Sequence, residues 1–417
     1  MPPREQVGLR ATVHGTFASE TREMGNQLTM ANSGPADYRG LPLSAMENIV
    51  TRFKERVDAA QLASPPSKER VGKALRREGS DRCLTRLNRF TTDVIVRYGD
   101  ALADLFCEFP DDVVFAVPYD FALGYQASNR PGRLSNVEAL MQEKEWVDEW
   151  GIGWKHAADG VGANPVSHPL KNWSQLDDYL RHQMPDPREP GRLTDALPTL
   201  AKHGATKYCV GVLNLTLSER LFALRGMECV FEDFYTHEKE IGRLCEALVE
   251  YVIGWIGDWG KTDVSAIFLG DDWGSQNALM ISPAMWRRHF KEHYRRIFAE
   301  VHRWGKDVLF HSCGNISSII ADLIEVGVDI LDPLQPGPLN LSEVARQFGG
   351  KVAFSGGIDD QRLEDYSPQE VKDMVRRTID TLGRPFGNAY MISAANSMLP
   401  SVPLENLQAM MQACHEQ

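Results

Sequence analysis

The chain has 417 residues, 43% of them hydrophobic and 24% charged, which is the composition of a globular protein that buries a sizeable core. Its formal net charge of -12 disfavours nucleic acid as a partner, because proteins that bind phosphate backbones usually present a basic face. No apolar run reaches the roughly 18 to 20 residues that a membrane helix needs, and the N-terminal residues lack the apolar centre of a signal peptide. The seven cysteines form no CxxC pair and are odd in number, so no disulfide framework is visible. We therefore expect a cytoplasmic protein without nucleic-acid or membrane partners.

The N-terminal part of the chain divides into a tail and a helical segment. Residues 1–42 are rich in Gly, Ser, Thr and Met and show no sustained period, which predicts a flexible tail. Met30 offers an alternative start, which leaves open whether residues 1–29 belong to the native protein. Residues 43–109 have helical periodicity and are expected to precede a core. Residues 43–417 as a whole are predicted to form one domain.

A first strand and a long irregular region follow these helices. The run 112–119 (DVVFAVPY) is apolar and β-branched, which predicts a buried strand. Residues 124–206 contain four tryptophans among many Gly and Pro residues and show no clear period. A stretch of that length is usually a functional insertion, and we expect it to lie over one end of the core.

The second half alternates short apolar runs with helical segments, which predicts a parallel sheet. The predicted strands are 208–213, 266–270, 307–310, 329–331, 352–355 and 388–392. A long helix is predicted from Pro283, with Ser282 as its N-cap, to Gly305. With strand 112–119 this gives seven strands, and the eighth is expected within the irregular region. The fold predicted is a (β/α)8 TIM barrel, in preference to an open doubly wound sheet.

Polar residues follow most of these strands, at the end where barrel enzymes place their active sites. They include Asp120, Asp271, Asp272, Trp273, His311, Cys313, Asp332, Gln335, Ser355, Asp359, Ser393 and Asn396. For any one of them taken alone, the start of a loop is the better explanation, and it is the repetition over several strands that indicates a site.

His311 and Cys313 are two residues apart, so on a strand they point to the same face. An imidazole nitrogen and a thiolate sulfur form a ligand pair suited to zinc, but catalytic zinc normally takes three protein ligands. The spacing alone leaves open a buried thiol beside a hydrogen-bonded histidine.

Several segments resemble the uroporphyrinogen decarboxylase-like superfamily in their order and spacing. They are GDDWGSQNALMISPAMW (270–286), VLFHSCGNISSIIADLIEVGVDILDPLQP (308–336), FSGGIDDQ (354–361) and VPLENLQAM (402–410). The resemblance implies a (β/α)8 barrel with one of two chemistries, the decarboxylation of uroporphyrinogen or zinc-dependent methyl transfer to corrinoid proteins or thiols. The arginine motif with which the decarboxylases hold their substrate is not found, which disfavours that activity.

The methyltransferase branch resembles this chain in its His-x-Cys pair, which matches His311 and Cys313. Its further cysteine after the last strand is absent here, where residues 391–397 read MISAANS. A carboxylate from Asp271 or Asp272 is expected to complete the ligand set, and Asp272 is taken as the third ligand. Asn315 and Gln335 are expected to orient His311.

Three functions follow. The leading hypothesis is a zinc-dependent enzyme that moves a methyl group from a small methylated substrate to a corrinoid protein or a thiol. The second is a metal-independent decarboxylase or other lyase that uses Asp120, Asp271 or Asp272 with His311 as acid-base groups. The third is a barrel that binds a small molecule or a corrinoid without catalysis. A homodimer is compatible with each.

The predicted site has catalytic and substrate-binding residues. The catalytic set is Asp120, Asp271, Asp272, His311 and Cys313, and the metal set is Asp272, His311 and Cys313. Substrate contacts are expected from Tyr119, Trp154, Arg225, Trp273, Gln335, Asp359 and Asn396. Arg225 is included because its planar fork suits a carboxylate, although a surface or structural salt bridge is the better explanation for a single arginine.

Overall fold

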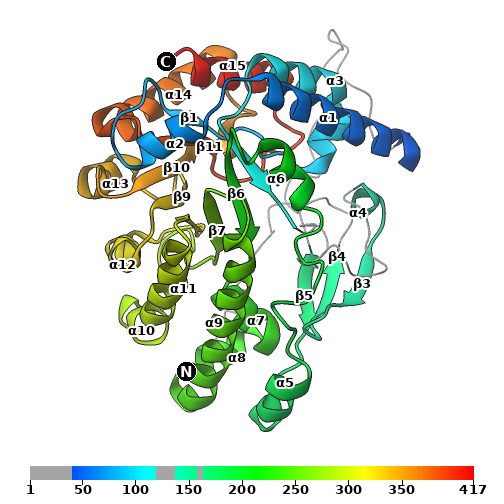
Figure 1. Cartoon of the computed structure of the whole chain (residues 1–417), viewed down its shortest axis with the longest axis vertical. Helices are drawn as coiled ribbons and strands as arrows, with labels where there is room; N and C mark the ends of the chain where they lie inside the picture. Colours follow the sequence, from blue (N-terminus) through cyan, green and yellow to red (C-terminus); the bar gives the residue numbers. More distant parts are fainter. Residues whose placement is uncertain (1–39, 119–136, 157–162) are drawn as a thin grey trace, which may run out of the picture. The chain divides into compact units, whose positions relative to one another are not determined.

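Eight parallel strands form one sheet in the order β1-β11-β10-β9-β8-β7-β6-β2, with helices outside it (Figure 1). The strands are β1 (Leu84–Thr85), β2 (Val113–Ala116), β6 (Tyr208–Leu213), β7 (Ala266–Gly270), β8 (Asp307–His311), β9 (Ile330–Leu334), β10 (Ala353–Ile358) and β11 (Tyr390–Ala394). This computed structural model describes residues 40–118, 137–156 and 163–417. Strands β6, β7, β9, β10 and β11 are buried along their whole length, as expected where both faces of a parallel sheet are covered. The predicted (β/α)8 barrel is thereby confirmed.

The eighth strand lies elsewhere than predicted. The irregular region was expected to hold it, and this was wrong, because the strand is β1, between the N-terminal helices. On one side β1 pairs with β11, and on the other it meets the residues that precede β2. The Asp112 amide donates to the Thr85 carbonyl (3.0 Å), and the Asp112 carboxylate accepts from the Thr85 amide (3.0 Å). Asp111 accepts from the amides of Leu87 (2.6 Å) and Asn88 (2.9 Å). Two carboxylates thus join the first and last strands of the sheet.

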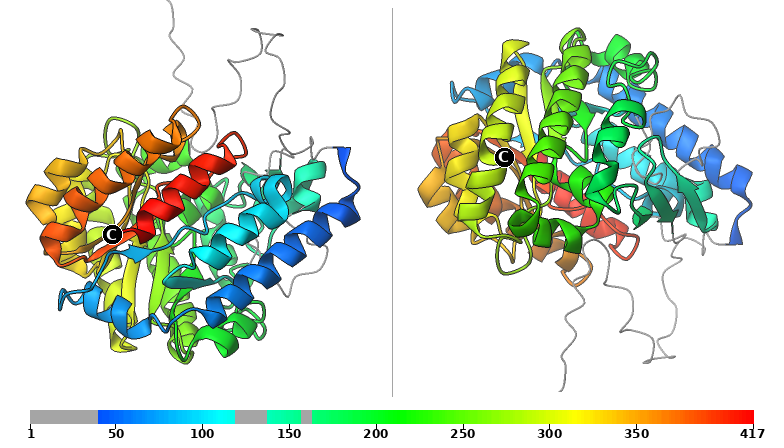
Figure 2. Two further views of the ribbon diagram at one scale, coloured as in Figure 1. Left: turned by 90° about the horizontal axis from the view of Figure 1, so that it is seen from above. Right: turned by 90° about the horizontal axis from the view of Figure 1, so that it is seen from below.

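The helices follow the strands in alternation. They are α1 (Leu43–Ala63), α2 (Lys68–Leu75), α3 (Thr92–Glu108), α7 (Ser218–Arg225), α8 (Met227–Thr236), α9 (Glu238–Gly260), α10 (Pro283–His289), α11 (Lys291–Arg303), α12 (Ile320–Val326), α13 (Leu341–Phe348), α14 (Pro368–Leu382) and α15 (Leu404–His415). Helices α1 and α3 pack side by side, and so do α14 and α15 (Figure 2). The predicted tail, residues 1–42, lies almost wholly outside the described residues. None of the helices in the described ranges has the length and apolarity needed to cross a membrane.

The long helix predicted from Pro283 to Gly305 is divided in two, at Phe290. Its start is as predicted, because the Ser282 hydroxyl accepts from the Met285 amide at 3.2 Å. Phe290 has a φ of -127° and separates α10 from α11. Its side chain is fully buried and its ring centroid lies 4.5 Å from that of Trp273. We infer that packing of this ring outweighs helical propensity at this position.

The insertion, residues 124–206, contains more regular structure than its sequence predicted. Its described part holds a three-stranded antiparallel sheet of β3 (Lys144–Val147), β4 (Gly153–His156) and β5 (Ala163–Ser167). The short helices α4 (Glu138–Met141), α5 (Leu176–His182) and α6 (Leu197–His203) flank this sheet in the sequence. The Leu170 amide donates to the Leu224 carbonyl, and the ring centroids of Trp150 and Tyr251 are 4.5 Å apart. The insertion therefore packs against α7 and α9.

Replacement of Asp112 by Ala is expected to weaken barrel closure strongly. The Asp112 side chain is 4% exposed and pairs with Arg82 (2.7 Å) and Arg70 (3.0 Å), which are 20% and 28% exposed, so its loss removes a buried acceptor that both arginines and the Thr85 amide share. We expect a loss of about 3–5 kcal/mol in the free energy of unfolding, measured by urea denaturation. Asp81→Ala is the matched control, because Asp81 also pairs with Arg70 but is 68% exposed. Its expected loss is below about 1 kcal/mol, and equal losses for the two variants would contradict this role.

Candidate active site at the strand ends

His311 and Cys313 lie at the carboxyl end of β8 and face the same side. The His311 Nε2 atom is 3.4 Å from the Cys313 Sγ atom. Ser312 faces away, where its hydroxyl accepts from the Trp273 amide at 3.0 Å. The alternation expected of a strand therefore continues past its last residue and brings the imidazole and the thiol together.

Asp272, from the end of β7, completes a group of three metal-ligating side chains. Its Oδ1 atom is 3.6 Å from His311 Nε2 and accepts from the Cys313 amide at 2.8 Å. The three ligand atoms all lie within 4.8 Å of one another, and no other such group occurs in the part of the chain that the structure describes. With Zn–N and Zn–O near 2.0 Å and Zn–S near 2.3 Å, a tetrahedral site places neighbouring ligand atoms roughly 3.3–3.5 Å apart. The donor set and the two measured separations fit zinc.

Asp332, inside β9, holds the other nitrogen of His311. Its Oδ2 atom is 2.7 Å from His311 Nδ1, and its Oδ1 atom accepts from Arg86 Nη1 (2.8 Å) and from the Ser355 hydroxyl (2.6 Å). Burial would raise the pKa of Asp332, but the charge of Arg86 and the bond to His311 hold it well below its ordinary value. Burial lowers the pKa of Arg86 to about 10, which leaves it charged at neutral pH. Both members of this ion pair are therefore ionised.

The Cys313 thiol has one further neighbour, at the end of the last strand. The thiol donates to Asn396 Oδ1 at 3.6 Å, and the backbone amide of Asn396 donates to the Asp360 carboxylate at 2.9 Å. Burial raises the pKa of Cys313 well above its ordinary value, and the Asp272 carboxylate adds to the shift. The thiol is therefore protonated at neutral pH, and binding of a metal would release its proton.

Two glycines bring the loops after β7 and β8 into direct backbone contact. The Gly274 amide donates to the Cys313 carbonyl at 3.1 Å, and the Asn315 amide to the Ser275 carbonyl at 2.8 Å. A Cβ on Gly274 would lie 2.4 Å from the Asn315 nitrogen, and one on Gly314 would lie 2.3 Å from the Gly274 oxygen. Gly314 also has a φ of +79°, which favours glycine. These glycines fix the backbone that carries Cys313.

Asp271, although adjacent to Asp272, has a structural role. Its buried carboxylate accepts from the amides of Leu217 (2.8 Å) and Glu219 (3.0 Å) at the start of α7, and from the Tyr294 hydroxyl (2.7 Å). Burial raises the pKa of Asp271 to about 7, and the Glu219 carboxylate adds to the shift. It caps a helix that has no side-chain cap of its own.

Three of the residues predicted to bind substrate are engaged elsewhere. Trp273 is 0% exposed, and its Nε1 atom donates to the Tyr294 hydroxyl at 2.9 Å behind the strand. Trp154 is buried in the insertion, where it donates to Asp148 at 2.8 Å. Arg225 binds Asp233 (2.7 Å) and the carbonyls of Leu170 and Lys171.

The remaining predicted residues lie at the strand ends or cannot be placed. Gln335 accepts from the Gly314 amide at 2.9 Å and so supports the turn after Cys313 rather than His311. Asp359 follows β10, where burial raises its pKa. Tyr119 and Asp120 lie outside the described residues. Asn315, which was expected to orient His311, instead donates to the Asn277 carbonyl at 3.2 Å.

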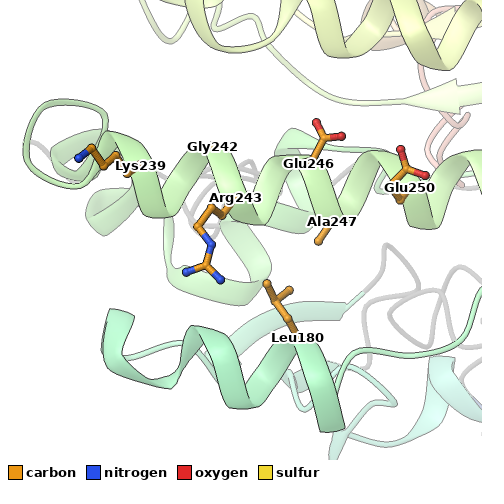
Figure 3. Close-up of a pocket in the computed structure, with 7 residues that line it drawn as sticks. All are labelled: Leu180, Lys239, Gly242, Arg243, Glu246, Ala247 and Glu250. Carbon is orange, nitrogen blue, oxygen red and sulfur yellow. The ribbon is translucent and has the colours of Figure 1, made fainter.

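The described part of the surface includes a hollow near the site and a groove on the helices. A hollow of about 490 Å³ opens between the loops after β7 and β8, and its lining side chains are amides, hydroxyls and apolar groups from residues 277–283, Asn315, Ser317 and Ser318. It begins two residues after Cys313. A groove of about 710 Å³ lies between α5 and α9, and Asp272, His311 and Cys313 are not among its lining residues (Figure 3).

The site predicted from the sequence included no role for Asp332, Arg86 or Ser355. Asp332 and Ser355 were noted as polar residues after apolar runs, which is the signal that could have marked them. Arg86 follows a strand of two residues, which is too short to show a period. Its position beside Asp332 depends on the pairing of strands far apart in the sequence.

A protein-family model described as "Uroporphyrinogen decarboxylase (URO-D)" matches residues 175–417, more than half of the chain. The chain belongs to the uroporphyrinogen decarboxylase family. The superfamily predicted from the sequence is thereby confirmed. The matched part includes all the strands from β6 to β11, and with them Asp272, His311, Cys313 and Asp332.

Within this family the similarity to individual proteins is low. The uroporphyrinogen decarboxylase of Legionella pneumophila (strain Corby) is 22% identical over 197 residues, which are 46% of this chain and 52% of that protein. The uroporphyrinogen decarboxylase of Thermus thermophilus is 24% identical over 184 residues, 44% of this chain and 50% of that protein. The chain thus spans about half the length of the curated relatives it matches. A methyltransferase from Methanosarcina mazei shares the fold, with a TM-score of 0.61 and 16% identity over 85% of this chain and 99% of that chain.

The two adjacent aspartates are expected to respond differently to replacement by Ala. Asp271→Ala leaves the buried amides of the α7 start without an acceptor, which should cost about 2 kcal/mol or more of the free energy of unfolding. Asp272→Ala should cost less stability but reduce zinc binding. Urea denaturation and zinc titration of each variant measure the two effects, and the reverse pattern would contradict the assignment.

Proposed function

We propose that this protein is a zinc-dependent enzyme that transfers a methyl group from a small methylated substrate to a corrinoid protein or a thiol. The group formed by Asp272, His311 and Cys313 carries the proposal, because nitrogen, sulfur and oxygen donors meet at the barrel end where active sites lie. Three protein ligands leave a fourth position for a substrate atom. The fold shared with a methyltransferase is compatible with this chemistry.

The transfer breaks the bond between the methyl carbon and its heteroatom and forms a bond to sulfur, or to cobalt(I), which supplies the electron pair and becomes cobalt(III). The departing heteroatom takes up the proton of the acceptor thiol or, with cobalt as the acceptor, a proton from solvent. When bound, zinc would polarise a methoxy or methylamino donor, or deprotonate an acceptor thiol. Asp332 holds His311 in place for this role through its 2.7 Å bond to Nδ1. The uncharged hollow beside Asn315 suits a small, neutral methylated compound.

Metal content is the first test. Protein purified without chelator is expected to contain about one zinc per chain, because the three ligands form one site. His311→Ala and Cys313→Ala should lose most of it, as measured by inductively coupled plasma mass spectrometry. His302→Ala and Cys229→Ala are matched controls outside the group and should retain it. Zinc near zero in the wild type, or unchanged in the two ligand variants, would contradict the proposal.

Activity is the second test. With free cob(I)alamin and a panel of methylated thiols, methylated amines and methyl ethers, we expect formation of methylcob(III)alamin, followed by absorbance. Removal of zinc by a chelator should abolish the reaction, and added zinc should restore it. Cys313→Ala should lower the rate by at least about 100-fold, by analogy with other groups that act on the transition state.

A metal-independent carboxy-lyase is the second candidate. Its support is the His311–Asp332 pair beside Asp272, which offers groups for proton transfer, together with the names of the matched relatives. Release of CO2 from a carboxylated substrate by chelator-treated protein would favour this candidate over methyl transfer.

A further inference from the structure

Asp332 connects His311 to a network of hydrogen-bond donors. Its Oδ2 atom faces His311 Nδ1 at 2.7 Å, while its Oδ1 atom accepts from Arg86 Nη1 and from the Ser355 hydroxyl. Asp332 is fully buried. We propose that Asp332 is a positioning residue that fixes the tautomer of His311, with the proton on Nδ1 and the lone pair of Nε2 directed at Asp272 and Cys313. This inference deepens the proposed function, because Nε2 is the proposed zinc ligand.

The ion pair with Arg86 makes Asp332 an acceptor. A carboxylate paired with a guanidinium at 2.8 Å is ionised and carries no proton to donate. The hydrogen between Asp332 and His311 must therefore belong to Nδ1. In a neutral imidazole the other nitrogen, Nε2, then has the free lone pair that a metal requires.

Arg86 is held where it is by the barrel interior. Its guanidinium carbon lies 4.0 Å from the ring centroid of Phe115 on β2 and 5.9 Å from that of Phe268 on β7. The side chain of Arg86 is 9% exposed. The guanidinium therefore stays in contact with Oδ1, and it can only donate.

This fixed donor predicts the outcome of Asp332→Asn. The oxygen of the introduced amide should face Arg86, which lies 2.8 Å from Oδ1, rather than Arg89, which lies 3.9 Å from Oδ2, so the NH2 group of that amide faces His311 Nδ1. Two donors cannot bond to each other, and Nδ1 must then become the acceptor. The proton moves to Nε2 and blocks the lone pair that points at Cys313 and Asp272. A neutral amide of almost the same shape as the carboxylate therefore changes the tautomer of His311 and leaves the ring in place.

The test compares the histidine tautomer and the zinc affinity of matched variants. In metal-free wild-type protein labelled with 15N-histidine, NMR should show Nδ1 of His311 protonated, with the signal assigned by its loss in His311→Ala. In Asp332→Asn the two nitrogens should exchange roles, and zinc affinity should fall by about 10–100-fold in competition with a colorimetric chelator. Asp329→Asn is the control, because Asp329 holds His302 Nε2 at the same 2.7 Å before β9, at the other end of the barrel. Asp329→Asn should leave the tautomer of His311 and the zinc affinity of the protein unchanged.

A rescue variant separates this role from a general loss of packing. Asp332→Asn leaves the Arg86 charge uncompensated, whereas Arg86→Met combined with Asp332→Asn removes both charges. In the double variant the introduced amide is free to turn its oxygen to Nδ1, and the wild-type tautomer should return with a recovery of zinc affinity. No recovery in a folded double variant would overturn the inference.

The wild-type spectrum keeps the test decisive if Asp332→Asn does not fold. Protonation of Nε2 rather than Nδ1 in the metal-free wild type would overturn the inference directly. If the wild type shows the expected tautomer but binds no zinc, the proposed function fails and the positioning role of Asp332 stands.

Discussion

The buried ion pair between Arg86 and Asp332 connects more of the barrel than any other interaction described above. Arg86 follows β1, Asp332 lies in β9, and the groups that they contact come from β2, β7, β8 and β10. Two charges withdrawn from water are costly unless each finds its partner, so an arrangement of these strands that separated Arg86 from Asp332 would leave both charges buried and unpaired. The position of His311 follows from that arrangement.

The sequence predicted the strands from β6 to β11 because each is a short apolar run between helical segments. It also predicted that His311 and Cys313 point to the same side, because the two-residue period of a strand is a local property. The family was visible in motifs from the same part of the chain. What these predictions share is that they depend on neighbours in sequence.

The errors concern properties that only the folded chain determines. β1 has two residues and is a strand because Leu84 and Thr85 pair with Met391 and Ile392 of β11, which follow about 300 residues later in the chain. Asp271 and Asp272 are the same residue type side by side, and the course of β7 decides which one faces His311. Trp273 and Arg225 have side chains suited to a binding site, but buried partners engage both. Phe290 divides a helix whose sequence pattern is continuous.

The contact between Gly274 and Gly314 has a consequence for redesign of this barrel. Because the two backbones touch without side chains between them, the loops after β7 and β8 behave as a single piece. A library that varies residues 277–283 can reshape the hollow while the glycines hold Cys313 in place. A loop grafted from another barrel would need a glycine at the position of Gly274 or Gly314, so that the two backbones can still touch. Exchanging both loops together is therefore a better route to new specificity than exchanging either loop alone.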